Sequence, residues 1–248
     1  MAGHSKWANI KHRKGTVDAR RSKLFTKLVK EIMVAAKVGG PVVESNPRLK
    51  MAIQNARGAS VPKDNIERAI SKASAQDGAD FLDVHYEGYG PHGVAILVEC
   101  TTDNLNRTIQ NVKSYFNKAG GSLSTNGSLD FIFSQKGVFR IPQPDGDMDV
   151  WILRWIDSGA QEVEIEDGKV TLQCEREDFG RLQKALHDEE IEAESSGLER
   201  IPLITKELNR EQAEELGKLL QNLENDDDVK AVYHNIAFAE EIADIIEA

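Results

Sequence analysis

The chain has 248 residues, of which 40% are hydrophobic, and a formal net charge of −10. This composition supports folded cores and excludes a globally disordered chain. No apolar run approaches the roughly 18 residues that a membrane-spanning helix needs, and the N-terminus lacks the apolar stretch of a secretory signal. Cys100 and Cys174 lie in apolar, strand-like runs and are interpreted as buried free thiols. We therefore expect a cytoplasmic protein with no membrane partner.

The charge is divided unevenly along the chain. Residues 1–72 contain 16 Lys and Arg against 5 Asp and Glu, whereas residues 73–248 contain 15 against 36. The net charges are therefore +11 and −21. This contrast indicates a basic module attached to an acidic body, which would direct any polyanion to one end of the molecule.

Three helices are predicted in the basic segment. Apolar residues from Leu24 to Ala36 recur at helical spacing over residues 18–38, and Gly39, Gly40 and Pro41 end this helix. A second helix begins at the capping residue Asn46 and is followed by Pro47. A third follows the sequence VPKDNIERAI, and residues 71–80 are small, polar and typical of a linker.

Strands and helices alternate in the remainder of the chain. Residues 82–134 predict two strands around a Gly/Pro turn, then a helix and a strand, and residues 205–236 predict a helix and a strand. Between them, the order is strand, helix, strand, strand, helix, strand, which is ferredoxin-like. The fold class is α+β with three domains, an N-terminal three-helix domain and two ferredoxin-like α/β domains, one inserted in the other. The predicted boundaries are 1–77, 78–135 with 205–248, and 136–204.

The sequence offers no constellation of catalytic or metal-binding residues. The six histidines are dispersed, and neither a Cys/His cluster nor the spacing of a calcium loop occurs. The glycine-rich run GYGPHG is interpreted as a turn, and Trp151 and Trp155 as core residues. The acidic runs at 188–194 and 226–228 are predicted to be solvated loops or helix ends. We expect no enzymatic activity, no cofactor and no metal.

The basic segment carries the candidate binding site. Lysine and arginine neutralise phosphates and release counterions, and an arm with interspersed polar and aromatic residues adds sugar and stacking contacts. A lysine-coated, solvated helix is the simpler interpretation, but the contrast with the acidic body favours nucleic acid. The predicted nucleic-acid-binding residues are Lys6, Trp7, Asn9, Lys11, His12, Arg13, Lys14, Arg20, Arg21, Lys23, Lys27 and Lys30.

Several blocks of the sequence closely resemble the YebC family. They are AGHSKWANIKHRKGTVDARRSKLFTKLVKEIMVAAK, NPRLKMAIQNAR, PKDNIERAI, YEGYGPHGVAILVECTTDNLNRT and DDVKAVYHN. The resemblance covers about residues 2–236, while the link between the first two helices and the tail at 237–248 depart from it. It implies a helical domain, a central α/β domain and an inserted α/β domain, with no catalytic residues.

The resemblance implies two competing functions. Bacterial relatives are described as DNA-binding transcriptional regulators, some of them quorum-sensing repressors. Others resemble translation factors, among them a mitochondrial activator of cytochrome oxidase synthesis and bacterial proteins that act on ribosomes stalled at proline runs.

We expect a non-enzymatic, DNA-binding transcriptional regulator, with a ribosome-associated factor that binds ribosomal RNA or tRNA as the alternative. The absence of a recognisable helix-turn-helix favours RNA. The acidic domains would contact proteins of the transcription machinery or the ribosome. An enzyme and a scaffold without a polyanion ligand are weaker alternatives.

Overall fold

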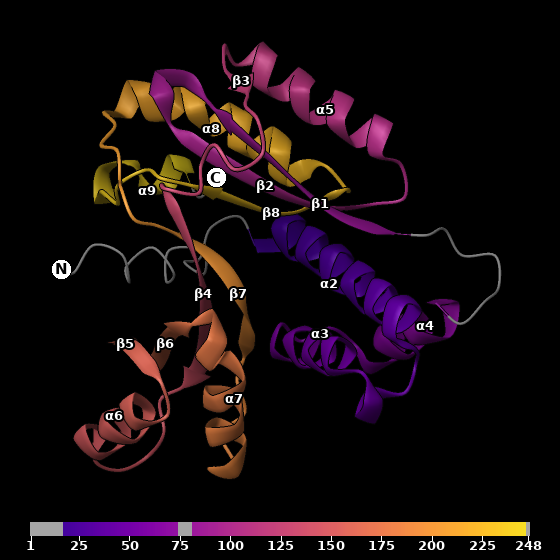
Figure 1. Ribbon diagram of the computed structural model, residues 1–248, viewed down its shortest axis with the longest axis vertical. Helices are drawn as coiled ribbons and strands as arrows, with labels where there is room; N and C mark the ends of the chain where they lie inside the picture. Colours follow the sequence, from indigo (N-terminus) through magenta and orange to yellow (C-terminus); the bar gives the residue numbers. More distant parts are fainter. Residues whose placement is uncertain (1–16, 74–80, 247–248) are drawn as a thin grey trace. The chain divides into compact units, whose positions relative to one another are not determined.

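The computed structural model describes residues 17–73 and 81–246, and side chains from Arg21 onward. Within these ranges the molecule is a mixed α+β protein with eight α-helices and two antiparallel four-stranded sheets (Figure 1). The described residues divide into two compact units. One contains the N-terminal helices from Leu24 together with the inserted domain, and the other contains the central domain. None of the described helices is long and apolar enough to cross a membrane.

The N-terminal helices form where the sequence predicts them. They are α2 (Val17–Gly39), α3 (Pro47–Gly58) and α4 (Lys63–Ala73). Asn46 joins the first two: its side-chain oxygen caps α3 by accepting from Leu49 N at 3.0 Å, and its amide donates to the carbonyls of Ala35 and Gly40 at 2.7 and 2.8 Å. Apolar residues of all three helices pack in one core that includes the fully buried Ile32 and Leu49.

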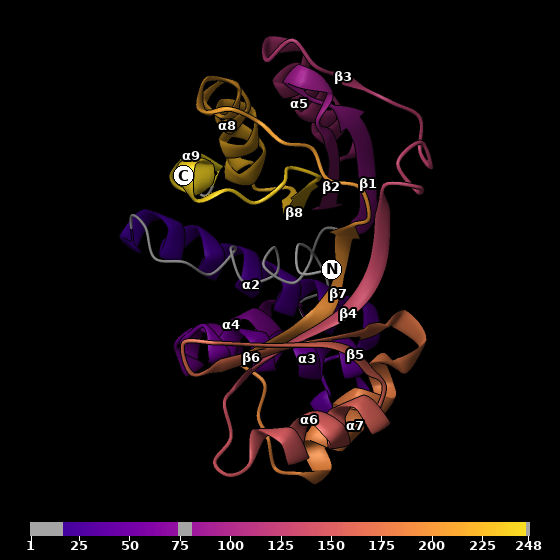
Figure 2. The ribbon, with the colours of Figure 1, turned by 90° about the vertical axis from the view of Figure 1, so that its left-hand side faces the viewer.

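Residues 133–202, which contain most of the predicted inserted domain, have the predicted ferredoxin-like order of elements. These are β4 (Phe133–Pro142), α6 (Met148–Asp157), β5 (Ala160–Glu166), β6 (Lys169–Glu175), α7 (Phe179–Asp188) and β7 (Ser195–Pro202). The sheet order is β5-β6-β4-β7, and α6 and α7 cover one face of the sheet (Figure 2). The β5–β6 hairpin turns at Asp167 and Gly168, whose positive φ angles of 50° and 76° suit the predicted two-residue turn. The core contains Trp155, as expected, and Cys174.

Helix α3 packs against the edge strand β7 within the same unit. The Asn55 side chain pairs with the backbone of Ser196 in both directions, donating to its carbonyl at 2.8 Å and accepting from its N–H at 2.9 Å. Gly58 allows close approach, because a Cβ atom at this position would lie 1.9 Å from the Glu194 carbonyl oxygen. At Ser196, the outer edge of β7 is therefore paired with a side chain rather than with another strand.

The central domain is built on a different sheet. Its elements are β1 (Leu82–Tyr89), β2 (Ala95–Thr102), α5 (Leu105–Lys118), β3 (Ser122–Leu123), α8 (Arg210–Asn225), β8 (Val229–His234) and α9 (Glu240–Ile246). The sheet order is β3-β1-β2-β8, with the β1–β2 hairpin in the middle. Residues from α5, α8 and α9 cover one face, while Leu129, Ile132 and Phe133 cover part of the other.

The prediction that this second domain is also ferredoxin-like is wrong. A ferredoxin-like order places a helix between the first two strands. Here β1 and β2 are joined directly at Gly90–Gly93, where His92 and Gly93 adopt φ angles of 60° and 69°. This tight connection makes β1 and β2 neighbours, so the later strands β3 and β8 take the two edges.

The C-terminal tail has a defined place in the central domain. Ile242 of α9 is 3% exposed and belongs to the core beneath α8, and Ile245 packs beside it. Arg210 at the start of α8 pairs with Asp244 of α9 at 3.0 Å. The tail therefore contains a helix that packs on α8.

Candidate nucleic-acid interface

The structure describes four of the twelve predicted ligands in full. Seven lie outside the described residues, namely Lys6, Trp7, Asn9, Lys11, His12, Arg13 and Lys14. Arg20 lies in α2, but its side chain is also outside the described part. The remaining four, Arg21, Lys23, Lys27 and Lys30, extend along the first half of α2.

The helix brings three of these lysines together. Lys23, Lys27 and Lys30 are separated by four and three residues, so they share one side of α2. Lys23 is exposed and Lys27 and Lys30 are half-buried, while Arg21 is exposed and lies on another side of the helix. Lys23 belongs to the compact unit that contains the central domain. Its ammonium donates a hydrogen bond to the Asn225 side-chain oxygen. The ammonium has three N–H donors, so this contact leaves donors for a phosphate.

The other two helices add cations that the predicted site omitted. Between Arg21 and Ala73 there are 11 basic and 4 acidic residues, a net charge of +7. Lys50, Arg57 and Lys72 are exposed and form no ion pair with any described residue. The charge count places them in the basic segment, but their exposure follows only from the packing of α3 and α4.

Arg48 forms an ion pair that links two helices of the bundle. The Arg48 guanidinium lies 2.8 Å from the Glu31 carboxylate, and both side chains are less than one-third exposed. This ion pair connects α3 to α2 and neutralises one positive charge. Arg48 is therefore a weaker phosphate-ligand candidate than the exposed residues of α3 and α4.

The aspartates at 226–228 follow the end of α8, as one of the two predicted alternatives has it, but Asp226 and Asp228 are buried rather than solvated. Asp228 is 6% exposed, and its carboxylate accepts from Arg107 Nη2 at 2.8 Å and from the Thr108 hydroxyl at 2.9 Å. Asp226 accepts from the Tyr115 hydroxyl at 3.0 Å. Burial and this hydrogen bond raise the pKa of Tyr115, and Asp228 raises the pKa of Arg107. The network joins α5 to the start of β8, so these carboxylates have a structural role.

A second buried carboxylate organises the loop before β4. Glu87 is 1% exposed and accepts from the backbone N–H groups of Gly127 and Leu129, each at 2.8 Å, and from the Ser128 hydroxyl at 3.2 Å. Burial alone would raise the pKa of Glu87, but these hydrogen bonds outweigh it and lower the pKa below its usual value. The glutamate thus anchors a loop and is saturated with donors.

The described side chains offer no metal centre or reactive thiol. Among them, no group of three or more His, Cys, Asp or Glu residues is placed to hold a metal ion. Both cysteines are buried free thiols, as predicted, and burial raises the pKa of Cys174 to about 11. A thiol that is protonated at neutral pH is a poor nucleophile.

Family models match almost the whole chain. A model of the "TACO1/YebC protein N-terminal domain" matches residues 5–76, and a model of the "TACO1/YebC second and third domain" matches residues 81–236. The chain belongs to the TACO1/YebC family. The family match ends before α9, in agreement with the departure expected for the tail.

This TACO1/YebC family member has a close curated relative and a similar solved structure. It is 52% identical over 240 residues to a "Probable transcriptional regulatory protein" of Amoebophilus asiaticus (strain 5a2), covering 96% of this chain and 98% of the relative. The crystal structure of a conserved hypothetical protein from Aquifex aeolicus matches with a TM-score of 0.81 and 39% identity. That match covers 96% of this chain and 98% of the other.

Proposed function

We propose that this TACO1/YebC family protein is a cytoplasmic, non-enzymatic regulator of transcription that binds DNA through its N-terminal basic domain. The observation that carries the proposal is the segregation of charge. The helices from Arg21 to Ala73 have a net charge of +7 in a chain whose total is −10. A cationic domain on an acidic body attracts a phosphate backbone and orients it.

The proposed interface consists of the arm residues from Lys6 to Lys14, together with Arg20, Arg21, Lys23, Lys27 and Lys30 of α2. We extend it to Lys50, Arg57 and Lys72, whose side chains are exposed. These groups bind phosphate without reading bases, so they supply affinity and position rather than sequence specificity. The name of the relative from Amoebophilus asiaticus supports a role in transcription.

We also propose the division into domains 1–77, 78–135 with 205–248, and 136–204. Separate apolar cores support it, one in the helical part, one in the inserted part and one on each face of the central sheet. In this arrangement the first domain holds nucleic acid, and the acidic second and third domains are available to protein partners of the transcription machinery.

The salt dependence of binding tests this interface. Replacing Lys11, Arg13, Lys14, Arg20 and Arg21 by Ala should flatten the plot of log K against log[salt] by about 0.7–0.9 per lost phosphate contact. The matched control is Glu44→Ala in the same domain, an exposed residue whose loss should leave the slope unchanged. An unchanged slope in the five-residue variant would contradict the assignment to the arm and α2.

The same cations would also bind ribosomal RNA or tRNA, because a lysine interacts in the same way with the phosphate groups of DNA and of RNA. Footprinting on promoter DNA at physiological salt and sucrose-gradient fractionation with and without nuclease separate these ligands. A sharp footprint supports the transcriptional proposal. Nuclease-sensitive co-migration with ribosomal particles, without a footprint, would instead identify a ribosome-associated translation factor.

A further inference from the structure

Helix α6 of the inserted domain is apolar on two opposite sides. Its inner side contributes the fully buried Trp155 to the domain core. Its outer side exposes Val150, Leu153 and Ile156, which are 45%, 64% and 50% accessible. These residues are spaced by three and form a stripe along the helix. Since an amphipathic surface helix normally places polar residues outward, this stripe is unusual.

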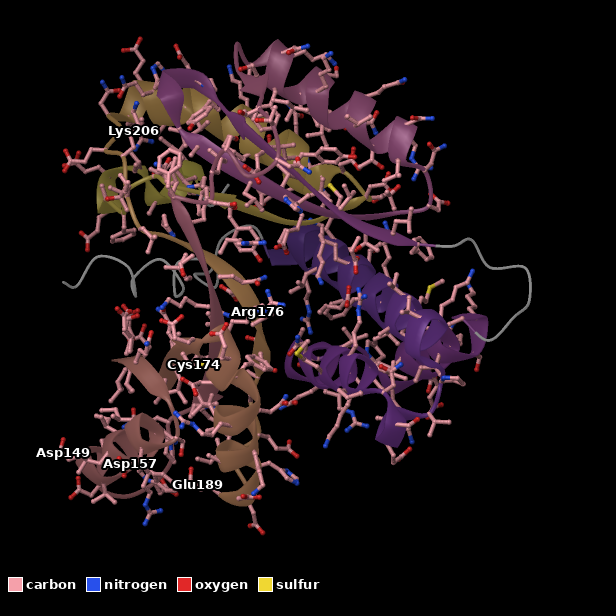
Figure 3. The ribbon with its side chains drawn as sticks, viewed as in Figure 1. Asp149, Asp157, Cys174, Arg176, Glu189 and Lys206 are labelled. Atoms are coloured by element: carbon pink, nitrogen blue, oxygen red, sulfur yellow. The ribbon has the colours of Figure 1, made fainter. Side chains whose placement is uncertain are left out.

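Two carboxylates accompany the stripe. Asp149 and Asp157 are exposed on the same side of α6, four residues before and after Leu153, and neither pairs with a described cation (Figure 3). Arg154, the one basic residue of α6, lies 5.1 Å from the centre of the Trp151 ring and 4.0 Å from Glu189. The outer surface therefore combines an apolar stripe with unpaired negative charge.

The charge of the whole domain reinforces this surface. Residues 136–204 contain 17 acidic and 8 basic residues, a net charge of −9. Nucleic acids and anionic membrane surfaces are repelled by such a domain. The apolar stripe itself points to a protein partner, because contiguous exposed apolar side chains mark interaction sites.

A second copy of this chain is a poor occupant of the same face. Two α6 helices packed antiparallel about Leu153 would place Asp149 of each copy opposite Asp157 of the other, since both lie four residues from the centre. Such a twofold contact brings like charges together twice. Like charges facing each other across an interface cost binding energy and reject that partner. The complementary partner carries cations at these positions.

We propose that the outer face of α6, formed by Asp149, Val150, Leu153, Ile156 and Asp157, docks a basic amphipathic helix of another protein. The partner's apolar residues pack along the stripe in the manner of a helix laid against a groove or ridge. Its lysines or arginines lie about 12 Å apart, because the two aspartates are eight residues apart on a helix that rises 1.5 Å per residue. With so few anchoring residues, the contact is transient.

The test uses a synthetic probe and the full-length protein. A peptide of about 16 residues, made only of Leu and Lys in an amphipathic pattern, spans roughly 24 Å as a helix. Its matched partner has Glu in place of every Lys. Titration of the isotopically labelled protein, followed by NMR, should shift the backbone amides of residues 148–157 and the Trp151 indole with the lysine peptide only.

Variants locate the binding. Leu153→Asp should raise the Kd of the lysine peptide at least about tenfold, equal to about 1.4 kcal/mol. The matched control is Ile109→Asp on α5, where an isoleucine is exposed to 43% of its surface. The double variant Asp149→Asn, Asp157→Asn retains the apolar stripe and should remove most of the salt dependence of binding.

Three results would overturn the proposal. The first is that the lysine peptide shifts amide signals of residues outside α6 instead of those within it. The second is that Leu153→Asp and Ile109→Asp change the affinity for the lysine peptide equally. The third is a dimer in sedimentation experiments that Leu153→Asp dissociates, since that result would assign the face to a second copy. If Leu153→Asp perturbs folding, the aspartate-to-asparagine variant still decides, because a salt dependence identical to that of the wild type contradicts the proposal.

Discussion

Selected acidic residues of the central and inserted domains lie in opposite environments. In the central domain, Glu87, Asp226 and Asp228 are at most 9% exposed, and each accepts several hydrogen bonds. In the inserted domain, Asp149 and Asp157 are exposed and pair with no described cation. Glu87, Asp226 and Asp228 therefore act as internal anchors, whereas Asp149 and Asp157 belong to an available surface.

This difference shows that the net charge of a domain does not identify which of its carboxylates are available to bind a ligand. A buried carboxylate persists only where donors replace its lost hydration, so its removal leaves those donors unsatisfied. An exposed carboxylate contributes little to the free energy of unfolding and remains free to meet a ligand. Removing single carboxylates from each domain should therefore separate the two roles.

The largest effect is expected at Glu87. Glu87→Ala should lower the free energy of unfolding by about 3 kcal/mol, because the buried N–H groups of Gly127 and Leu129 lose their acceptor. Urea denaturation of the variant and of Glu207→Ala, an exposed glutamate in the same domain, measures the difference. Equal stability of the two variants would show that the loop before β4 does not depend on this carboxylate.

The contribution of Glu87 should also depend on pH. Its pKa is lowered in the folded protein, so the ionised form is favoured by folding. The resulting stability is present above the unfolded pKa of about 4.3 and is lost as the pH falls through the lower folded value. The difference in unfolding free energy between wild type and Glu87→Gln should therefore be largest near pH 6 and should narrow below about pH 4. A difference that widens at acid pH would contradict this sign.

Asp228 should give the next largest effect. Asp228→Asn replaces a charged acceptor with a neutral one and weakens its bonds to Arg107 and Thr108, so we expect a loss of about 2 kcal/mol. Denaturation should be compared with Asp227→Asn, an exposed neighbour. A larger loss in the Asp227 variant would mean that the network between α5 and β8 is not held by Asp228.

Much of the fold is predictable where the signal is local. Asn46 marks the start of α3, and the pair Asp167–Gly168 marks the β5–β6 turn, because capping and tight turns depend on residues close in sequence. The β1–β2 turn was predicted correctly, but the ferredoxin-like assignment of the central domain was wrong, because the places of β3 and β8 at the sheet edges depend on pairing with strands far away in the chain. The buried aspartates were missed for the same reason: Asp228 and Arg107 are 121 residues apart.

The candidate site shows the same limit. The helical spacing of apolar residues predicted α2 correctly. The charge count located the basic segment, since composition needs no knowledge of contacts. It did not single out Arg57 or Lys72, whose exposure emerges only when α3 and α4 pack. Nor did the sequence predict the contact of Asn55 with Ser196, which joins residues 141 positions apart.

That contact supplies a test of how the helical domain and the inserted domain stabilise each other. Asn55→Ala removes two hydrogen bonds to the backbone of Ser196 and should lower the unfolding free energy by about 1.5 kcal/mol. Gln54→Ala, which loses a single longer bond of 3.3 Å to the Ala193 carbonyl, should cost less. Hydrogen exchange of the β7 amides should accelerate in the Asn55 variant and not in the Gln54 variant. Unchanged exchange in the Asn55 variant would show that contact with α3 does not stabilise β7.

The smallest effect on stability is expected at Asp149 and Asp157, which are proposed to bind the partner helix. Asp149→Asn with Asp157→Asn should change the unfolding free energy by no more than about 0.5 kcal/mol, because both side chains are exposed and unpaired among the described residues. The same double variant should bind the lysine peptide with reduced affinity and little salt dependence. A stability loss as large as that of Asp228→Asn would instead make these aspartates structural, and the contrast between the two domains would disappear. Unchanged stability together with weaker, salt-insensitive binding would show that these carboxylates differ in role from the buried ones of the central domain. Only an exposed charge can be removed without lowering the free energy of unfolding while its removal still weakens the binding of a ligand.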